Sequence, residues 1–167
     1  MTEGERYKIQ QAQPWLERVN IAAKAAKRAQ LLVETLERIA DGAGGIDYAR
    51  EHVSGTEFRD RIADAMDGLL EARAKAETSM VEYRREVNEA ARRLYPLDAE
   101  DFSILAACYF EGKDSTRDAF EELNAHREQI GLEPYHGSTI YRKRDEALLA
   151  AYEYIPTEWR DPRPSAI

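Results

Sequence analysis

Residues 13–41 have the sequence QPWLERVNIAAKAAKRAQLLVETLERIAD, a stretch without glycine that decides the fold. Apolar residues recur in it at alternating intervals of four and three, which places them on one face of a helix. This face consists of Trp15, Val19, Ala22, Ala26, Ala29, Val33, Leu36 and Ala40. Pro14 suits a first helical turn, where its missing N–H would be unpaired anyway. We therefore predict a long helix over about residues 13–41, ended by the glycines that follow.

A second long helix with the same period is predicted from Gly55 or Thr56 to about Tyr95. Its apolar face consists of Phe58, Ile62, Ala65, Leu69, Ala72, Ala76, Met80, Tyr83, Val87, Ala90 and Leu94. Pro96 ends it, because a residue before proline is disfavoured in helical geometry. The glycine-bearing loop at about 42–55 would join the two helices into an antiparallel hairpin over residues 1–96. Two helices alone bury little apolar area, so we expect a homodimer through the hairpin or a third packing partner.

The remaining chain is predicted to form short helices. They are expected over about 99–111, 115–130 and 139–154, with an irregular, proline-bearing tail over 156–167. Asp98 is placed to cap the first of these helices, and Ser138 or Thr139 the last. The predicted fold class is all-α: a long antiparallel helical hairpin (1–96) followed by a small three-helix, helix-turn-helix-like bundle (97–155).

Composition excludes several classes of protein. The 167 residues include 32 Asp and Glu against 24 Lys and Arg, a net charge of −8. No run reaches the roughly 18 apolar residues that span a bilayer, and the polar start lacks the apolar segment of a secretory signal. Cys108 is the single cysteine, which excludes an internal disulfide. We expect a cytoplasmic protein with no membrane partner.

Residues for catalysis or metal binding are not grouped in the sequence. His52, His126 and His136 lie in separate segments without the spacing of a metal site. The glycines at 42–45 are not followed by the Lys-Ser/Thr of a phosphate-binding loop. Cys108 lies in a helix that is expected to pack, as a buried structural thiol. We therefore expect no catalytic residue, no cofactor and no metal, and a protein that is not an enzyme.

The stretch STIYRKRDEALL, residues 138–149, carries the strongest functional signal. Its first half is polar and basic and its second half is apolar, as in a recognition helix that reads the DNA major groove from an apolar scaffold. The candidate DNA-binding residues are Ser138, Thr139, Tyr141, Arg142, Lys143 and Arg144. The two hydroxyls would contact phosphates, and the other four would contact bases or backbone. The alternative is a capped surface helix whose basic residues balance Asp145 and Glu146.

The charge of the C-terminal part argues against DNA. Residues 98–167 hold 8 basic and 15 acidic side chains, whereas contacts to phosphate supply most non-specific affinity for DNA. Either the acidic residues lie on 98–111 and Glu121–Glu122, away from the basic cluster, or this part binds protein. The second function that we consider is therefore a non-enzymatic, all-helical protein–protein interaction or assembly module without DNA binding.

Three stretches are similar to a known family. They are VSGT (53–56), LAACYFEG (105–112) and TIYR (139–142), the last followed by ALL (147–149). With the long helices before them, they resemble phage-encoded transcriptional regulators that have a domain similar to the fourth region of bacterial sigma factors. Late-operon and autolysin-regulator-like proteins belong to this group. The resemblance implies a helix-turn-helix that binds DNA through the helix beginning near Thr139, and a hairpin that dimerises or engages RNA polymerase.

Overall fold

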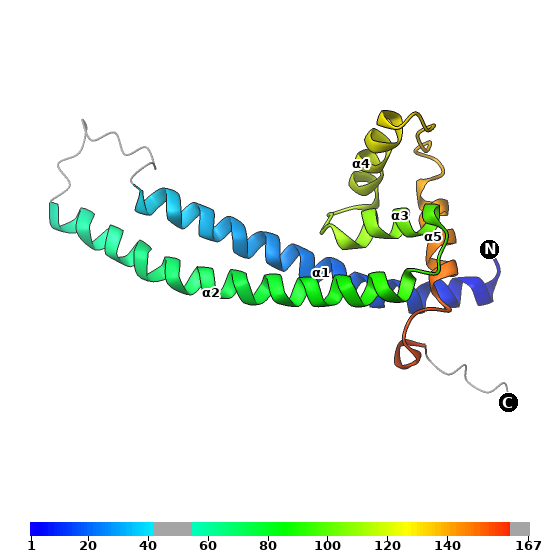
Figure 1. Ribbon diagram of the computed structural model, residues 1–167, viewed down its shortest axis with the longest axis horizontal. Helices are drawn as coiled ribbons and strands as arrows, with labels where there is room; N and C mark the ends of the chain where they lie inside the picture. Colours follow the sequence, from blue (N-terminus) through cyan, green and yellow to red (C-terminus); the bar gives the residue numbers. More distant parts are fainter. Residues whose placement is uncertain (42–54, 161–167) are drawn as a thin grey trace. The chain divides into compact units, whose positions relative to one another are not determined.

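The computed structural model describes the backbone of residues 1–41 and 55–160 and the side chains of these residues outside 55–62 (Figure 1). This part of the chain contains helices and turns and no strand, which confirms the all-α class. The elements are α1 (Glu3–Ala40), α2 (Gly55–Leu94), α3 (Ala99–Leu105), the π-helix η1 (Ala106–Phe110), α4 (Thr116–Gln129), α5 (Ile140–Ala151) and the 3₁₀-helix η2 (Thr157–Trp159). Most of the predicted loop (42–54), including His52, and the tail beyond 160 lie outside the described residues.

Helix α1 begins ten residues earlier than the sequence predicted. It starts at Glu3, so Pro14 lies inside the helix rather than in its first turn. Ile9 and Ala12, which precede Pro14, are buried in the same core as Trp15. Burial of this extra apolar surface offsets the backbone hydrogen bond that Pro14 cannot make.

The chain divides into two compact units. The larger unit contains residues 1–24 together with everything from residue 83 onward, and the smaller unit contains residues 25–82. The core of the larger unit is built from large side chains. Its bulkiest fully buried members are Trp15, Leu16, Val19, Leu94, Ile104, Leu105, Phe120, Leu148 and Ile155. The start of α1, the end of α2 and the short helices therefore share one core.

The smaller unit has a much smaller core. Its buried cluster consists of Ala29, Val33, Ala72 and Ala76, with Leu36 and Leu69 packed at its edge. In this unit α1 and α2 lie side by side, since a Cβ on Gly68 would meet Leu36 at 3.9 Å. Arg73 also reaches Glu37 at 2.8 Å. Described side chains of both predicted apolar faces thus line the contact.

Capping residues position the short helices of the larger unit. Asp98 accepts a hydrogen bond from the backbone N–H of Asp101 at 2.9 Å, which confirms it as the cap of α3. Ser115 caps α4 in the same way, through the N–H of Asp118 at 3.1 Å. Gly112 ends η1 with a φ of +64°, and a Cβ there would lie 3.1 Å from Ala23. Only glycine fits this position without strain.

The start of α5 and the end of the described chain differ from the prediction. Thr139 occupies the cap position of α5, but its hydroxyl donates to the carbonyl of His136 and does not cap the helix. After α5, residues 157–159 of the predicted irregular tail form a short 3₁₀-helix. Trp159 lies against the core, with the Arg18 guanidinium 5.6 Å from its ring centre.

Among the helices of the described chain, none is both long enough and apolar enough to cross a bilayer.

Candidate nucleic-acid interface

Helix α5 packs into the core of the larger unit by one apolar face. Ile140, Ala147, Leu148 and Ala151 are buried, as expected from their spacing of about one and two helical turns. Residues that project away from this face are exposed, among them Tyr141 and Arg142. The sequence therefore gives α5 an apolar base and a polar surface near its N-terminus.

The six predicted DNA-binding residues lie together at the N-terminal end of α5 and in the turn before it. Ser138, Tyr141 and Arg142 are exposed, and Thr139, Lys143 and Arg144 are partly buried. The side chains of the three cations differ in exposed fraction, which is 63% for Arg142, 31% for Lys143 and 21% for Arg144. Accessibility to a ligand therefore falls in that order.

Arg144 makes contacts that hold α5 to its neighbour. It donates to Asp145 at 2.7 Å and to the Thr116 hydroxyl, on the first turn of α4, at 3.2 Å. Its guanidinium also lies 5.6 Å from the ring centre of Tyr141. These contacts make Arg144 a residue that orients α5 and Tyr141.

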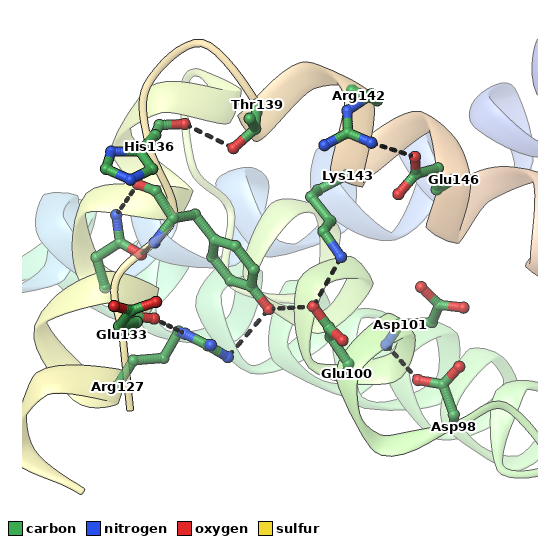
Figure 2. Close-up of polar contacts among 12 residues, drawn as sticks. Asp98, Glu100, Asp101, Arg127, Glu133, His136, Thr139, Arg142, Lys143 and Glu146 are labelled. Atoms are coloured by element: carbon green, nitrogen blue, oxygen red, sulfur yellow. Dashed lines mark hydrogen bonds and ion pairs between the residues drawn. The ribbon is translucent and has the colours of Figure 1, made fainter. Parts of the chain in front are cut away.

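Arg142 and Lys143 have carboxylate partners of different kinds. Arg142 pairs with Glu146 one turn along α5, at 3.2 Å, in a contact between exposed side chains. Lys143 extends from α5 to α3, where its Nζ lies 3.0 Å from Oε1 of Glu100 (Figure 2). One cation is thus paired within its own helix, and the other ties two helices together.

Tyr135, in the long turn between α4 and α5, is the residue that sequence reasoning missed. Its hydroxyl donates to Glu100 at 2.8 Å and accepts from Arg127 at 3.0 Å. Its backbone N–H and carbonyl pair with the side-chain amide of Asn124, and its ring meets Phe120 edge-on at 5.5 Å. The turn is therefore fixed to α4 and, through Glu100, to α3.

The pKa shifts follow from these contacts. Hydrogen bonds from Tyr135 and then Lys143 lower the pKa of Glu100, so it is a carboxylate at neutral pH. Burial, with the neighbouring Glu100, raises the pKa of Tyr135 to about 12. Partial burial, followed by the adjacent carboxylate of Asp98, raises the pKa of Asp101 to about 6. Glu100 of α3 thus faces the basic side of α5.

An open groove runs beside α5 on the side of α4. Arg117, Asn124 and Glu121 of α4 line it together with Gly137 and Tyr141. Arg117 is exposed and pairs with Glu121 at 3.2 Å. The groove joins polar residues of the two helices on one accessible surface.

Metal binding and thiol reactivity depend on how the His, Cys, Asp and Glu side chains of the described chain are placed. No group of three or more His, Cys, Asp or Glu side chains is arranged there to hold a metal ion. Cys108 is buried, and burial raises the pKa of its thiol to about 12. Since the thiolate is the reactive form of cysteine, Cys108 is suited to packing.

Comparisons of the chain with known protein families, with curated proteins and with solved structures found no match.

Proposed function

We propose that this protein is a phage- or prophage-type, DNA-binding transcriptional regulator, with a helix-turn-helix like that of sigma-factor region 4. In this proposal α4 and α5 are the two helices of the motif, α3 supports them, and α5 enters the major groove. The observation that carries it is the N-terminal half of α5, where Tyr141 and Arg142 are exposed above a buried apolar base. The resemblance of the TIYR segment to recognition helices supports the same function.

The carboxylate partners of Arg142 and Lys143 do not prevent this binding. Ion pairs between exposed side chains contribute about 0–1 kcal/mol, and the Arg142–Glu146 pair is of this type. DNA presents one phosphate about every 1.7 Å along its axis. A phosphate can therefore replace Glu146 at small cost.

The proposal gives the six residues different tasks. Tyr141 and Arg142 contact base edges, because they are the exposed side chains of the first turn of α5. Ser138, Thr139 and Lys143 contact phosphates and set the register of the helix. Arg144 keeps α5 in place through Thr116. None of these tasks is catalytic, so the protein is proposed to act without a cofactor and not as an enzyme.

The long helices are proposed to form the antiparallel hairpin that dimerises the protein or engages RNA polymerase. The support is a set of large apolar side chains that the smaller unit leaves at the surface. They are Leu31, Leu32, Ile39, Met66, Leu70 and Val81. In the proposal these side chains form the apolar contact with the partner, since apolar surface that gathers in one exposed patch marks sites of protein interaction. A regulator of this kind would work in the bacterial cytoplasm.

The test is binding of a fluorescent random-sequence duplex, measured by anisotropy at low salt. The double variant Arg142→Ala with Lys143→Ala removes two proposed DNA contacts, and we expect affinity to fall by at least about tenfold. The matched control is Arg38→Ala with Arg73→Ala, which makes the same charge change on exposed residues of the smaller unit. The control should bind as the wild type does. Equal losses in both variants would contradict the proposed site.

One observation favours the second candidate, an all-helical interaction module without DNA binding. Arg142, Lys143 and Arg144 each have a carboxylate partner within the protein, in a region with 15 acidic and 8 basic side chains. A surface of alternating, already paired charges suits a protein partner. This candidate predicts that the wild-type protein ignores duplex DNA even at low salt.

A further inference from the structure

Glu100 holds Lys143 from a different element of the fold. Its Oε1 atom accepts from the Tyr135 hydroxyl at 2.8 Å and from the Lys143 Nζ at 3.0 Å (Figure 2). The carboxylate therefore sits between the α4–α5 turn and α5. Glu100, a residue of α3, is thus ion-paired with Lys143, which the proposed function assigns to DNA binding.

The position of Glu100 is fixed before any ligand arrives. Tyr135, which holds it, is itself held by Asn124 through two hydrogen bonds of 2.7 and 3.0 Å and by Arg127. Glu146, by contrast, pairs with Arg142 as an exposed neighbour on the same helix. A fixed partner loses less side-chain entropy on pairing than a free one, so Glu100 is the stronger of the two competitors.

The chemistry of the contact matches that of a DNA phosphate. A carboxylate and a phosphate are both anionic oxygen acceptors, and the lysine ammonium is a compact charge that binds either. The side chains of Lys143 and Glu100 are 31% and 47% exposed, so solvent and ligands reach the pair. A phosphate that approaches Lys143 meets Glu100 already bound there.

We propose that Glu100 is an intramolecular competitor of DNA phosphate for Lys143, and that it lowers the affinity of the protein for DNA irrespective of sequence. This inference rests on the proposed function. DNA binding exchanges the Glu100 carboxylate for a phosphate at the Lys143 Nζ. The residue thereby reduces binding at non-specific sites, where phosphate contacts supply the affinity, and leaves discrimination to base contacts.

The test compares Glu100→Gln with the wild type by anisotropy titration of a random-sequence duplex at low salt. The carboxamide oxygen still accepts from Tyr135, while the charge that retains Lys143 is gone. We expect affinity to rise about three- to tenfold, the size of one screened charge interaction. Glu100→Asp keeps the net charge and withdraws the carboxylate by one methylene, so it should bind with an affinity between the two.

Controls separate competition from a change in net charge or in folding. Glu122→Gln makes the same charge change on α4, away from the groove that faces α5, and should bind as the wild type does. Lys143→Ala should weaken binding. It should also reduce the slope of log affinity against log salt concentration by about one, the contribution of one phosphate contact. Circular dichroism checks that each variant keeps the wild-type helix content.

The outcomes distinguish this inference from the proposed function. If Glu100→Gln binds no tighter than the wild type, or if Glu122→Gln gains equally, Glu100 is not a competitor. If Lys143→Ala leaves affinity and salt dependence unchanged, Lys143 does not contact phosphate and the inference is wrong. If the wild type and all variants ignore DNA, the proposed function itself fails.

Discussion

The two compact units are built from helices with the same apolar period but cores of different size. In the larger unit the period brings in Trp15 and Val19, which share a core with Phe120, and all three are at most 1% exposed. In the smaller unit the same period brings in Ala29, Ala72 and Ala76. Burial of apolar area stabilises at about 25 cal/mol per Å², so an alanine face contributes far less than an aromatic one.

The apolar period of a helix and the stability of the unit that it builds are therefore separate properties. The intervals of four and three predict helices in both units, and both form. What the intervals do not specify is how firmly each unit is held, because that depends on side-chain volume and on third partners. The larger unit has such partners in α3, α4 and α5. The smaller unit has none among the described residues of this chain, which is where a second copy or RNA polymerase is proposed to bind.

The largest expected effect is in the larger core. Phe120→Ala should lower the free energy of unfolding by about 3–5 kcal/mol, because it removes a fully buried ring and leaves a cavity. Val33→Ala, in the smaller unit, should cost only about 1–2 kcal/mol for the two methyl groups that it removes. Chemical denaturation followed by circular dichroism measures both. Equal costs would break the comparison between the two units.

A smaller effect is expected at the cap of α4. Ser115→Ala removes the oxygen that accepts from the Asp118 N–H and should cost about 1 kcal/mol. Hydrogen exchange should show faster exchange in the first turn of α4 and no change in residues 63–82. Ser103→Ala is the control, because Ser103 is exposed and donates to the Ala99 carbonyl inside α3. A loss of protection in the smaller unit would contradict the independence of the two cores.

An effect that appears only in the pH dependence of stability is expected from Asp101. Its pKa is raised to about 6, mainly by burial, from about 4 in the unfolded chain. The folded state therefore disfavours the carboxylate, and the wild type loses stability as pH rises from about 4 to above 6. Asp101→Asn should have a higher melting temperature than the wild type at pH 8, and this difference in melting temperature should vanish near pH 4. A difference that is independent of pH would contradict the assignment to Asp101.

Local rules were enough to predict much of the fold. The start of α2 at Gly55 and its end at Leu94 follow from period and from Pro96, and Asp98 caps α3 as expected. The predicted start of α1 was wrong because Pro14 was assigned to the first helical turn, although apolar residues before it continue the same helical face. Ile9 and Ala12 could have been recognised, since they continue the face of Trp15 at intervals near one helical turn.

The candidate site was only partly predictable. The side chains of α5 that reach the surface follow from its period, as the exposure of Tyr141 and Arg142 illustrates. The partners of Lys143 and Arg144 do not, because Glu100 and Thr116 are distant in sequence. Tyr135 was missed for the same reason. Contacts between elements depend on tertiary packing, which a single sequence pattern does not encode.

The central claim is that the N-terminal half of α5 binds DNA. Its most direct test is the affinity of the wild-type protein for a random-sequence duplex, measured from about 50 to 200 mM salt. Binding is expected to be measurable at the lowest salt, and the logarithm of affinity is expected to fall linearly with the logarithm of salt concentration. A protein that binds no duplex at the lowest salt would contradict the claim.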